Sequence, residues 1–248
     1  MAKRDNCKQP NGTHDTYLSH VDNLRSIEYS IKDQFQILKL KIKKDEISTP
    51  HYSSSLKNLI LLLGIWSESR LNKLLSEPDA FTAREIDIIN LYKQKIAQWN
   101  IVVELSFRKH YSIHIGEELN EDNLGKDNFH KYNKIQDTIR DYLKVIVEMR
   151  NKLAHGQWCC QLNKSGNSLN TETITILNNE NYISLQVKYQ LLKYFGDLIY
   201  LLAVSNPAFS TQFESLYKEI NDRSIRLQKH VDNEHLKFID KIRKRQNR

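Results

Sequence analysis

Apolar residues recur at intervals of three and four along most of this chain, which is the spacing of an amphipathic helix. The clearest run lies between residues 15 and 44, where Leu18, Val21, Leu24 and Ile27 fall on one helical face. The 248 residues include only 7 Gly and 4 Pro, too few for a sandwich or barrel built from many tight turns. We therefore predict an all-α fold class, a helical bundle with long helices.

The same spacing predicts six helices, at residues 15–44, 53–75, 82–113, 129–154, 184–205 and 208–244. The second contains the most hydrophobic stretch of the chain, so we expect it to be central. Thr82 and Glu85 form a capping-box signature at the start of the third. Gly156 stands where a glycine commonly ends a helix, just after the fourth.

The segment at about residues 157–178 follows another pattern. Gln157–Leu162 and Thr171–Leu177 alternate like two short strands around a polar loop, so we predict a small β-hairpin insertion here. The domain organisation that follows is a disordered N-terminus (1–14), one helical domain (15–205) and a basic C-terminal helix (206–248) that packs on or extends that domain.

Charge and hydropathy limit the partners. The formal net charge is +7, and the last twelve residues contain six basic residues and one acidic residue, which favours an anionic partner. No apolar run approaches the roughly 18 residues of a membrane helix, and the N-terminus lacks the apolar core of a signal peptide. Three cysteines do not make a disulfide framework. We predict a soluble, cytoplasmic protein with no membrane partner.

The string with most chemical content is Arg150-Asn151-Lys-Leu-Ala-His155-Gly156, at the end of the fourth predicted helix. Asn151 and His155 are four residues apart and share a helical face, and the Arg150 side chain is long enough to reach the same site. Arginine binds phosphate through a planar fork, and histidine transfers protons near neutral pH. Such a set of side chains can promote the cleavage of RNA by the RNA's own 2′-hydroxyl, without a metal or a cofactor.

Two considerations limit that interpretation. One histidine supplies only half of an acid–base pair, and a twofold homodimer that brings two such helix ends together would supply two. Arg and His near a helix C-terminus also interact favourably with the helix dipole, by about 0.3–1 kcal/mol each. The string is therefore equally compatible with a helix end that has no catalytic role.

Arg150-Asn-Lys-Leu-Ala-His155 resembles the Arg-x4–6-His motif of HEPN domains, in the form with Asn after Arg. HEPN domains are all-α bundles, many of them metal-independent endoribonucleases of toxin–antitoxin and phage-defence systems. The resemblance covers about residues 50–205 and implies that Arg150 binds the scissile phosphate, that His155 acts as base or acid, and that Asn151 positions one of them. It also implies a composite site in a homodimer, and an antitoxin or defence-system protein as a further partner.

The predicted helix with Trp66, Glu68 and Arg70 resembles an early HEPN helix whose polar residue supports the active site. By that resemblance Glu68 and Arg70 are supporting residues, while the alternative for Glu68 is an exposed contact within its own helix. The residues expected to bind RNA are basic and lie within the motif or in the C-terminal tail: Lys152, Lys241, Arg243, Lys244 and Arg245.

Two other patterns are weaker. His110 and His114 have the spacing of a metal-ligand pair but lack a third ligand, so we expect surface histidines and no metal site. Cys159 and Cys160 are adjacent, and strand alternation would point them to opposite faces, one of them into the core. Catalysis by Cys159 with His155 is a remote alternative.

The main rival to a nuclease is a non-catalytic HEPN-like module that binds nucleotide or RNA, or docks on a partner. A third alternative is a helical interaction protein.

Overall fold

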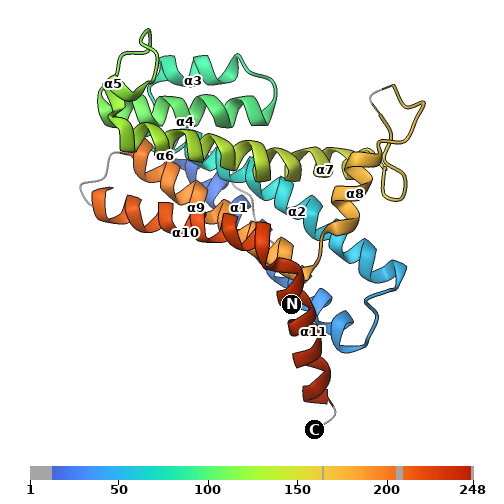
Figure 1. Cartoon of the computed structure of the whole chain (residues 1–248). Coiled ribbons are helices and arrows are strands. Elements are labelled where there is room, and N and C mark those ends of the chain that lie inside the picture. The colour runs from blue at the N-terminus through green and yellow to red at the C-terminus, as the bar shows by residue number, and fades with distance from the viewer. Residues whose placement is uncertain (1–12, 164, 205–208, 247–248) are drawn as a thin grey trace.

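The computed structural model describes residues 13–163, 165–204 and 209–246, and this part of the chain is helical, with no strand longer than a single isolated bridge (Figure 1). The all-α prediction is confirmed. The predicted disorder of residues 1–14 falls almost wholly outside the described residues. The elements are α1 (Thr13–Lys43), α2 (Pro50–Leu75), α3 (Ala83–Asn90), α4 (Lys95–Tyr111), α5 (Glu121–Leu124), α6 (Lys126–Thr138), the π-helical segment η1 (Ile139–Leu143), α7 (Lys144–Ala154), α8 (Thr171–Asn179), α9 (Tyr182–Val204), α10 (Phe209–Lys229) and α11 (Val231–Gln246).

Helices α2 and α9 form the centre of the bundle. α2 packs against α1, α7 and α9, and α9 packs in addition against α10, α4 and α11. Many of their apolar side chains are fully buried, as at Leu59 and Leu63 of α2 and Leu198 and Ile199 of α9. The central position expected for the most hydrophobic predicted helix is confirmed. No helix in the described ranges combines the length and the apolar character that crossing a membrane requires.

The predicted helix at 82–113 is two helices, α3 and α4. Its start is correct: the Thr82 hydroxyl accepts the Glu85 N–H at 3.3 Å, and the Glu85 carboxylate accepts the Thr82 N–H at 2.7 Å. The chain leaves the helix after Asn90, and Leu91 is 79% exposed. The apolar spacing continues through the connection between α3 and α4, although this connection is not buried. Periodicity alone therefore does not reveal the break between the two helices.

The predicted β-hairpin is wrong. Residues 171–179 form α8, and the segment before it contains only the isolated bridge between Leu162 and Leu169. Leu177 is buried and Ile174, three residues earlier, is half-buried, so burial follows the helical period and overrides the strand preference of the β-branched residues. The Thr175 hydroxyl donates to the Thr171 carbonyl at 2.8 Å within the helix.

The predicted helix at 208–244 is also divided, into α10 and α11, with the break at His230. Asp232 and Glu234 lie in the first turn of α11, where acidic side chains favour a new helix start. The Arg226 guanidinium bonds to Glu234 across the break at 2.7 Å. In Figure 1, α11 runs away from the body of the bundle, although Ile239 and Ile242 on its inner face are buried.

Helices α6 and α7 are joined through η1 into one rod that crosses the bundle (Figure 1). The predicted single helix at 129–154 lies within this rod, and the rod begins three residues earlier, at Lys126. The π-helical segment offsets the faces of α6 and α7, because a π turn contains an extra residue. The rod ends at His155, where the Arg150–His155 motif lies.

Candidate functional site

The last turn of α7 is closed by a glycine in the left-handed region. Gly156 has φ +78°, its N–H donates to the Leu153 carbonyl at 3.1 Å, and the Gln157 N–H donates to the Lys152 carbonyl at 3.0 Å. This pair of bonds is the Schellman motif. The predicted terminal role of Gly156 is confirmed, and the motif residues occupy the final turn and the C-cap of the helix.

Arg150 is held from two sides. Its Nη2 donates to Oε2 of Glu68 on α2 at 2.7 Å, and its Nη1 donates to Oδ1 of Asn151 at 2.9 Å. The Arg150 and Glu68 side chains are 24% and 23% exposed. Partial burial holds the two side chains against each other, and the exposed part of the guanidinium is still accessible to a ligand from solvent. The alternative for Glu68, a contact within its own helix, is not what the structure has.

The close approach of α2 and α7 depends on Gly64. A Cβ added at residue 64 would lie 2.4 Å from Arg150 Cβ and 2.5 Å from its Cγ, so no larger residue fits without movement of a helix. Glu68 is one turn farther along the same face of α2 and reaches the guanidinium from there. Sequence reasoning missed Gly64, although an isolated glycine inside an apolar helical run is a known signal of close packing.

Asn151 and His155 lie at the exposed end of the same turn. The Asn151 carbonyl accepts the His155 N–H at 3.1 Å, and the amide side chain accepts from Arg150. Among the described residues, no side chain or backbone group bonds to the His155 imidazole. Both ring nitrogens are therefore open to a ligand or to a second copy of the chain.

Arg70 does not join this group. Its Nη2 pairs with Oδ1 of Asp197 on α9 at 2.6 Å, and its Nε lies 2.8 Å from the position of a Cβ added at Gly196. The supporting residues expected from the resemblance thus separate. Glu68 contacts Arg150, while Arg70 fastens α2 to α9.

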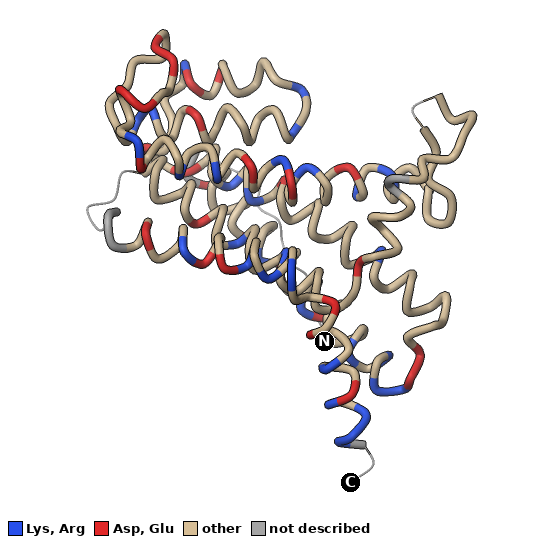
Figure 2. Tube along the Cα trace, in the orientation of Figure 1, with Lys and Arg blue, Asp and Glu red and all other residues tan. Residues whose placement is uncertain are grey.

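The residues expected to bind RNA also separate. The Lys152 ammonium is bonded to the Leu162 carbonyl in the loop after α7, and Arg243 pairs with Asp45 at the end of α1. Lys241, Lys244 and Arg245 are exposed and have no ion-pair partner in the described part of the chain. Figure 2 shows the basic positions gathered in the outer half of α11, in a region separate from the end of α7.

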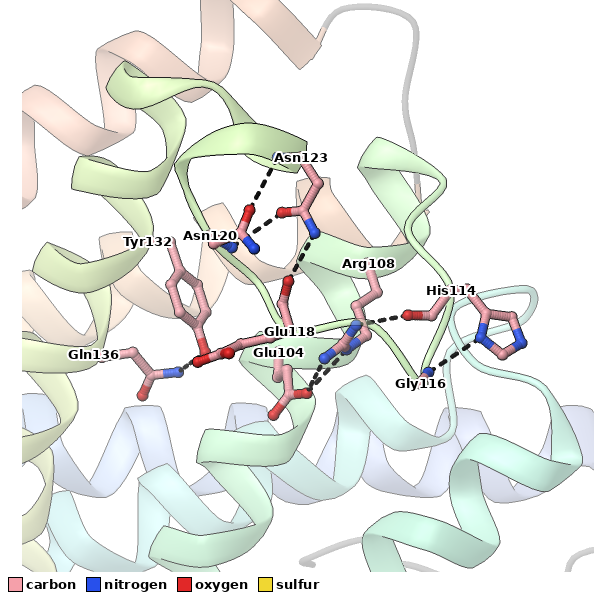
Figure 3. A network of polar contacts seen from close by, with 9 residues as sticks. All are labelled: Glu104, Arg108, His114, Gly116, Glu118, Asn120, Asn123, Tyr132 and Gln136. Carbon is pink, nitrogen blue, oxygen red and sulfur yellow. Dashed lines mark hydrogen bonds and ion pairs between the residues drawn. The ribbon is translucent and has the colours of Figure 1, made fainter.

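A second polar network, at the C-terminal end of α4, holds the following loop in place (Figure 3). Arg108 is buried; its Nη2 and Nε donate to Oε1 of Glu104 at 2.7 and 2.9 Å, and its Nη1 donates to the His114 carbonyl at 2.8 Å. Burial and the nearby Glu104 charge raise the pKa of Tyr132. Since Arg108 bonds to groups of the chain itself, the network fastens the loop after α4 to that helix.

The same region corrects the expectation for the two histidines. α4 ends at Tyr111 and Ser112 is left-handed at φ 55°, so His110 and His114 do not share a helical face. His110 is half-buried and burial lowers its pKa, whereas His114 is exposed and its Nδ1 accepts the Gly116 N–H at 3.1 Å. Within the described ranges no three His, Cys, Asp or Glu side chains are grouped as a metal site would require.

Comparison of the chain with models of known protein families, with curated proteins and with solved structures finds no match. The site is therefore interpreted from its own geometry and from the resemblance of its motif.

Proposed function

We propose that this protein is a metal-independent endoribonuclease of the HEPN type, which cleaves RNA by attack of a 2′-hydroxyl on the adjacent phosphate. The observation that supports it is the arrangement at the end of α7. Arg150, Asn151 and His155 lie on one helix end, and Glu68 from α2 fixes the guanidinium. The motif thus has an ordered cation in the last turns of α7 and an exposed histidine at the C-cap of the same helix.

Each residue has a distinct role in this proposal. Arg150 binds the phosphate and stabilises the negative charge that develops on its oxygens in the transition state. His155 takes the proton of the 2′-hydroxyl or gives one to the leaving 5′-oxygen. Asn151 and Glu68 are positioning residues, because they act on the guanidinium.

The missing half of the acid–base pair comes, in this proposal, from a second copy of the chain. A twofold homodimer in which two α7 ends face each other would supply two His155 and two Arg150. Exposure of His155 and Asn151 in the single chain leaves this face available for such pairing. A role in toxin–antitoxin or phage-defence systems, with an antitoxin or activator as partner, rests on the motif resemblance.

The test is RNA cleavage in EDTA by the purified protein and by His155→Ala. We expect the wild type to leave 2′,3′-cyclic phosphate ends and the variant to be slower by about 10²–10⁴-fold. His130→Ala, at an exposed histidine of α6, is the matched control and should cleave normally. Equal cleavage by wild type and His155→Ala would show that the activity is a contaminant or lies elsewhere.

One observation favours a second candidate, a non-catalytic module that binds nucleotide or RNA. The charge of Arg150 is already paired with Glu68 within the chain, which leaves less of it to stabilise the charge that develops in a transition state. This candidate predicts that His155→Ala retains affinity for RNA, that Arg150→Ala loses it, and that no concentration of wild-type protein cleaves.

A further inference from the structure

Cys159 and Cys160 are adjacent free cysteines, and both are exposed. They lie in the loop between α7 and α8, outside any helix or strand. The expectation that one of them is in the core is wrong, because the segment is not a strand and both residues are exposed. The two cysteines follow His155 by four and five residues.

The residues on either side of the pair are fixed. The Gln157 side chain accepts the Leu162 N–H at 2.8 Å, and the Gln161 side-chain amide donates to the Gln157 carbonyl. Gln161 is 1% exposed, and its carbonyl accepts the Asn170 N–H at 2.8 Å. The two cysteines are therefore the outward-facing part of a loop that is closed beneath them.

The chemistry of neighbouring cysteines differs from that of a structural disulfide. Adjacent Cα atoms are about 3.8 Å apart, below the roughly 4.4–6.8 Å that disulfides prefer. A bond between them is strained, and strained, exposed disulfides are the ones that are easily reduced again. Such a pair is suited to reversible oxidation and not to stabilising a fold.

We propose that Cys159 and Cys160 form a reversible redox modification site, which is oxidised by a low-molecular-weight disulfide such as oxidised glutathione. One cysteine thiolate attacks a sulfur of the glutathione disulfide, and one glutathione leaves as its thiolate. The neighbouring cysteine loses its proton and attacks the protein sulfur of the mixed disulfide, and the second glutathione leaves. Two protein thiols are oxidised to one disulfide, one glutathione disulfide is reduced to two thiols, and the two cysteine protons end on the glutathiones.

The loop is joined to the motif helix at two points. The Lys152 side chain bonds to the Leu162 carbonyl, and the Gln157 N–H closes the end of α7 on the Lys152 carbonyl. A disulfide between Cys159 and Cys160 closes a small ring that includes their peptide bond, and it changes the backbone conformation between residues 157 and 162. It therefore changes the position of the last turn of α7, where His155 lies. This consequence for cleavage rests on the proposed function, whereas the thiol chemistry does not.

The test uses the full chain with Cys7→Ser, which leaves these two cysteines as the only thiols. The protein is incubated with oxidised glutathione, alkylated with iodoacetamide and analysed by mass spectrometry, intact and after trypsin. Cleavage after Lys152 and Lys164 places both cysteines in one peptide. We expect that peptide to lose two hydrogens, without a glutathione adduct or alkylation, and to regain both thiols in dithiothreitol.

Cys159→Ser and Cys160→Ser in the same background are the matched controls. Each should retain a glutathione adduct, because the second thiol that would displace it is absent. Stable adducts on both cysteines of the parent, disulfide-linked chains, or two unreacted thiols would each overturn the proposal.

A second measurement compares RNA cleavage by the oxidised and the reduced protein. We expect oxidation to slow cleavage by about 10- to 100-fold, since small misplacements at a reactive site have effects of that size. The double serine variant should not respond. If the reduced protein does not cleave RNA while the ring still forms, the proposed function fails and the redox site stands.

Discussion

Helix α2 takes part in two arginine–carboxylate pairs that are built alike. Glu68 of α2 binds Arg150 of α7 at 2.7 Å, and Arg70 of α2 binds Asp197 of α9 at 2.6 Å. In each pair the arginine is half-buried, at 24% exposure for Arg150 and 16% for Arg70. Both pairs join α2 to a neighbouring helix, so fixing a helix pair is a function that they share.

The two pairs differ in what surrounds the guanidinium. Arg150 also binds Asn151 and lies at a helix end whose C-cap is His155, whereas Arg70 lies within α2 and faces α9. In the described part of the chain, the Arg70–Asp197 pair is bonded to no histidine. The Glu68–Arg150 pair lies on a helix whose C-cap is an exposed histidine, and this makes it the candidate for a catalytic role.

The largest expected effect is a difference in RNA cleavage between variants of the two arginines, Arg150 and Arg70. Arg150→Ala should reduce RNA cleavage by about 100- to 1,000-fold, because a preorganised cation at the phosphate is lost. Arg70→Ala removes a similar interhelical pair and should leave cleavage close to the wild-type rate. The measurement is single-turnover cleavage of a labelled RNA, with helicity by circular dichroism for both variants. Equal loss in both variants would mean that the pairs matter only for the fold.

The end of α7 is where sequence reasoning worked best, for a physical reason. The glycine at 156, the helical spacing before it and the motif are all local features, and local features do not depend on how distant helices pack. Contact between Glu68 and Arg150 spans 82 residues and was expected only through the motif resemblance. The partner of Arg70 could not be predicted, because Asp197 is distant in sequence and its helix has no motif.

The errors also have physical causes. In the sequence, the residues from Thr171 to Leu177 are interpreted as alternating in polarity, and most of them are β-branched. Both signals favour a strand, yet burial of Leu177 selects the helix α8. The breaks at Leu91 and His230 occur inside runs of acceptable helical spacing. They depend on where neighbouring helices pack, which a one-dimensional pattern does not contain.

The second prediction compares the glycines under the two arginines. Gly64→Ala sets a Cβ 2.4 Å from Arg150 Cβ, next to the helix backbone, while Gly196→Ala meets the Arg70 Nε at 2.8 Å, near the end of a flexible chain. We expect Gly64→Ala to lower the free energy of unfolding by about 1–3 kcal/mol through overpacking. For Gly196→Ala, the gain in helix propensity of about 1 kcal/mol should offset the smaller clash. Urea unfolding of both variants is the measurement, and a larger loss for Gly196→Ala would reverse the comparison.

The third prediction concerns the carboxylates. Glu68→Gln removes the charge that neutralises Arg150 and should strengthen binding of a non-cleavable 2′-O-methyl RNA by about 0.5–1 kcal/mol. Asp197→Asn should leave that affinity unchanged. Fluorescence anisotropy at fixed salt gives both dissociation constants. Weaker binding by Glu68→Gln would contradict this prediction and show that the orientation Glu68 gives the guanidinium matters more for affinity than the charge it neutralises.

The smallest expected effect concerns the salt dependence of RNA affinity, and it compares a basic residue of α11 that has an ion-pair partner with one that has none. Lys241 is exposed and without an ion-pair partner among the described residues, while Arg243, two positions on, pairs with Asp45. If the outer face of α11 tracks the RNA backbone, Lys241→Ala should reduce the slope of log affinity against log salt by about 0.7, the value for one contact with a single strand. Arg243→Ala should leave the slope unchanged, because its charge is already used within the fold. A slope that neither variant changes would confine RNA contact to the end of α7 and make the basic helix a solvated extension of the bundle.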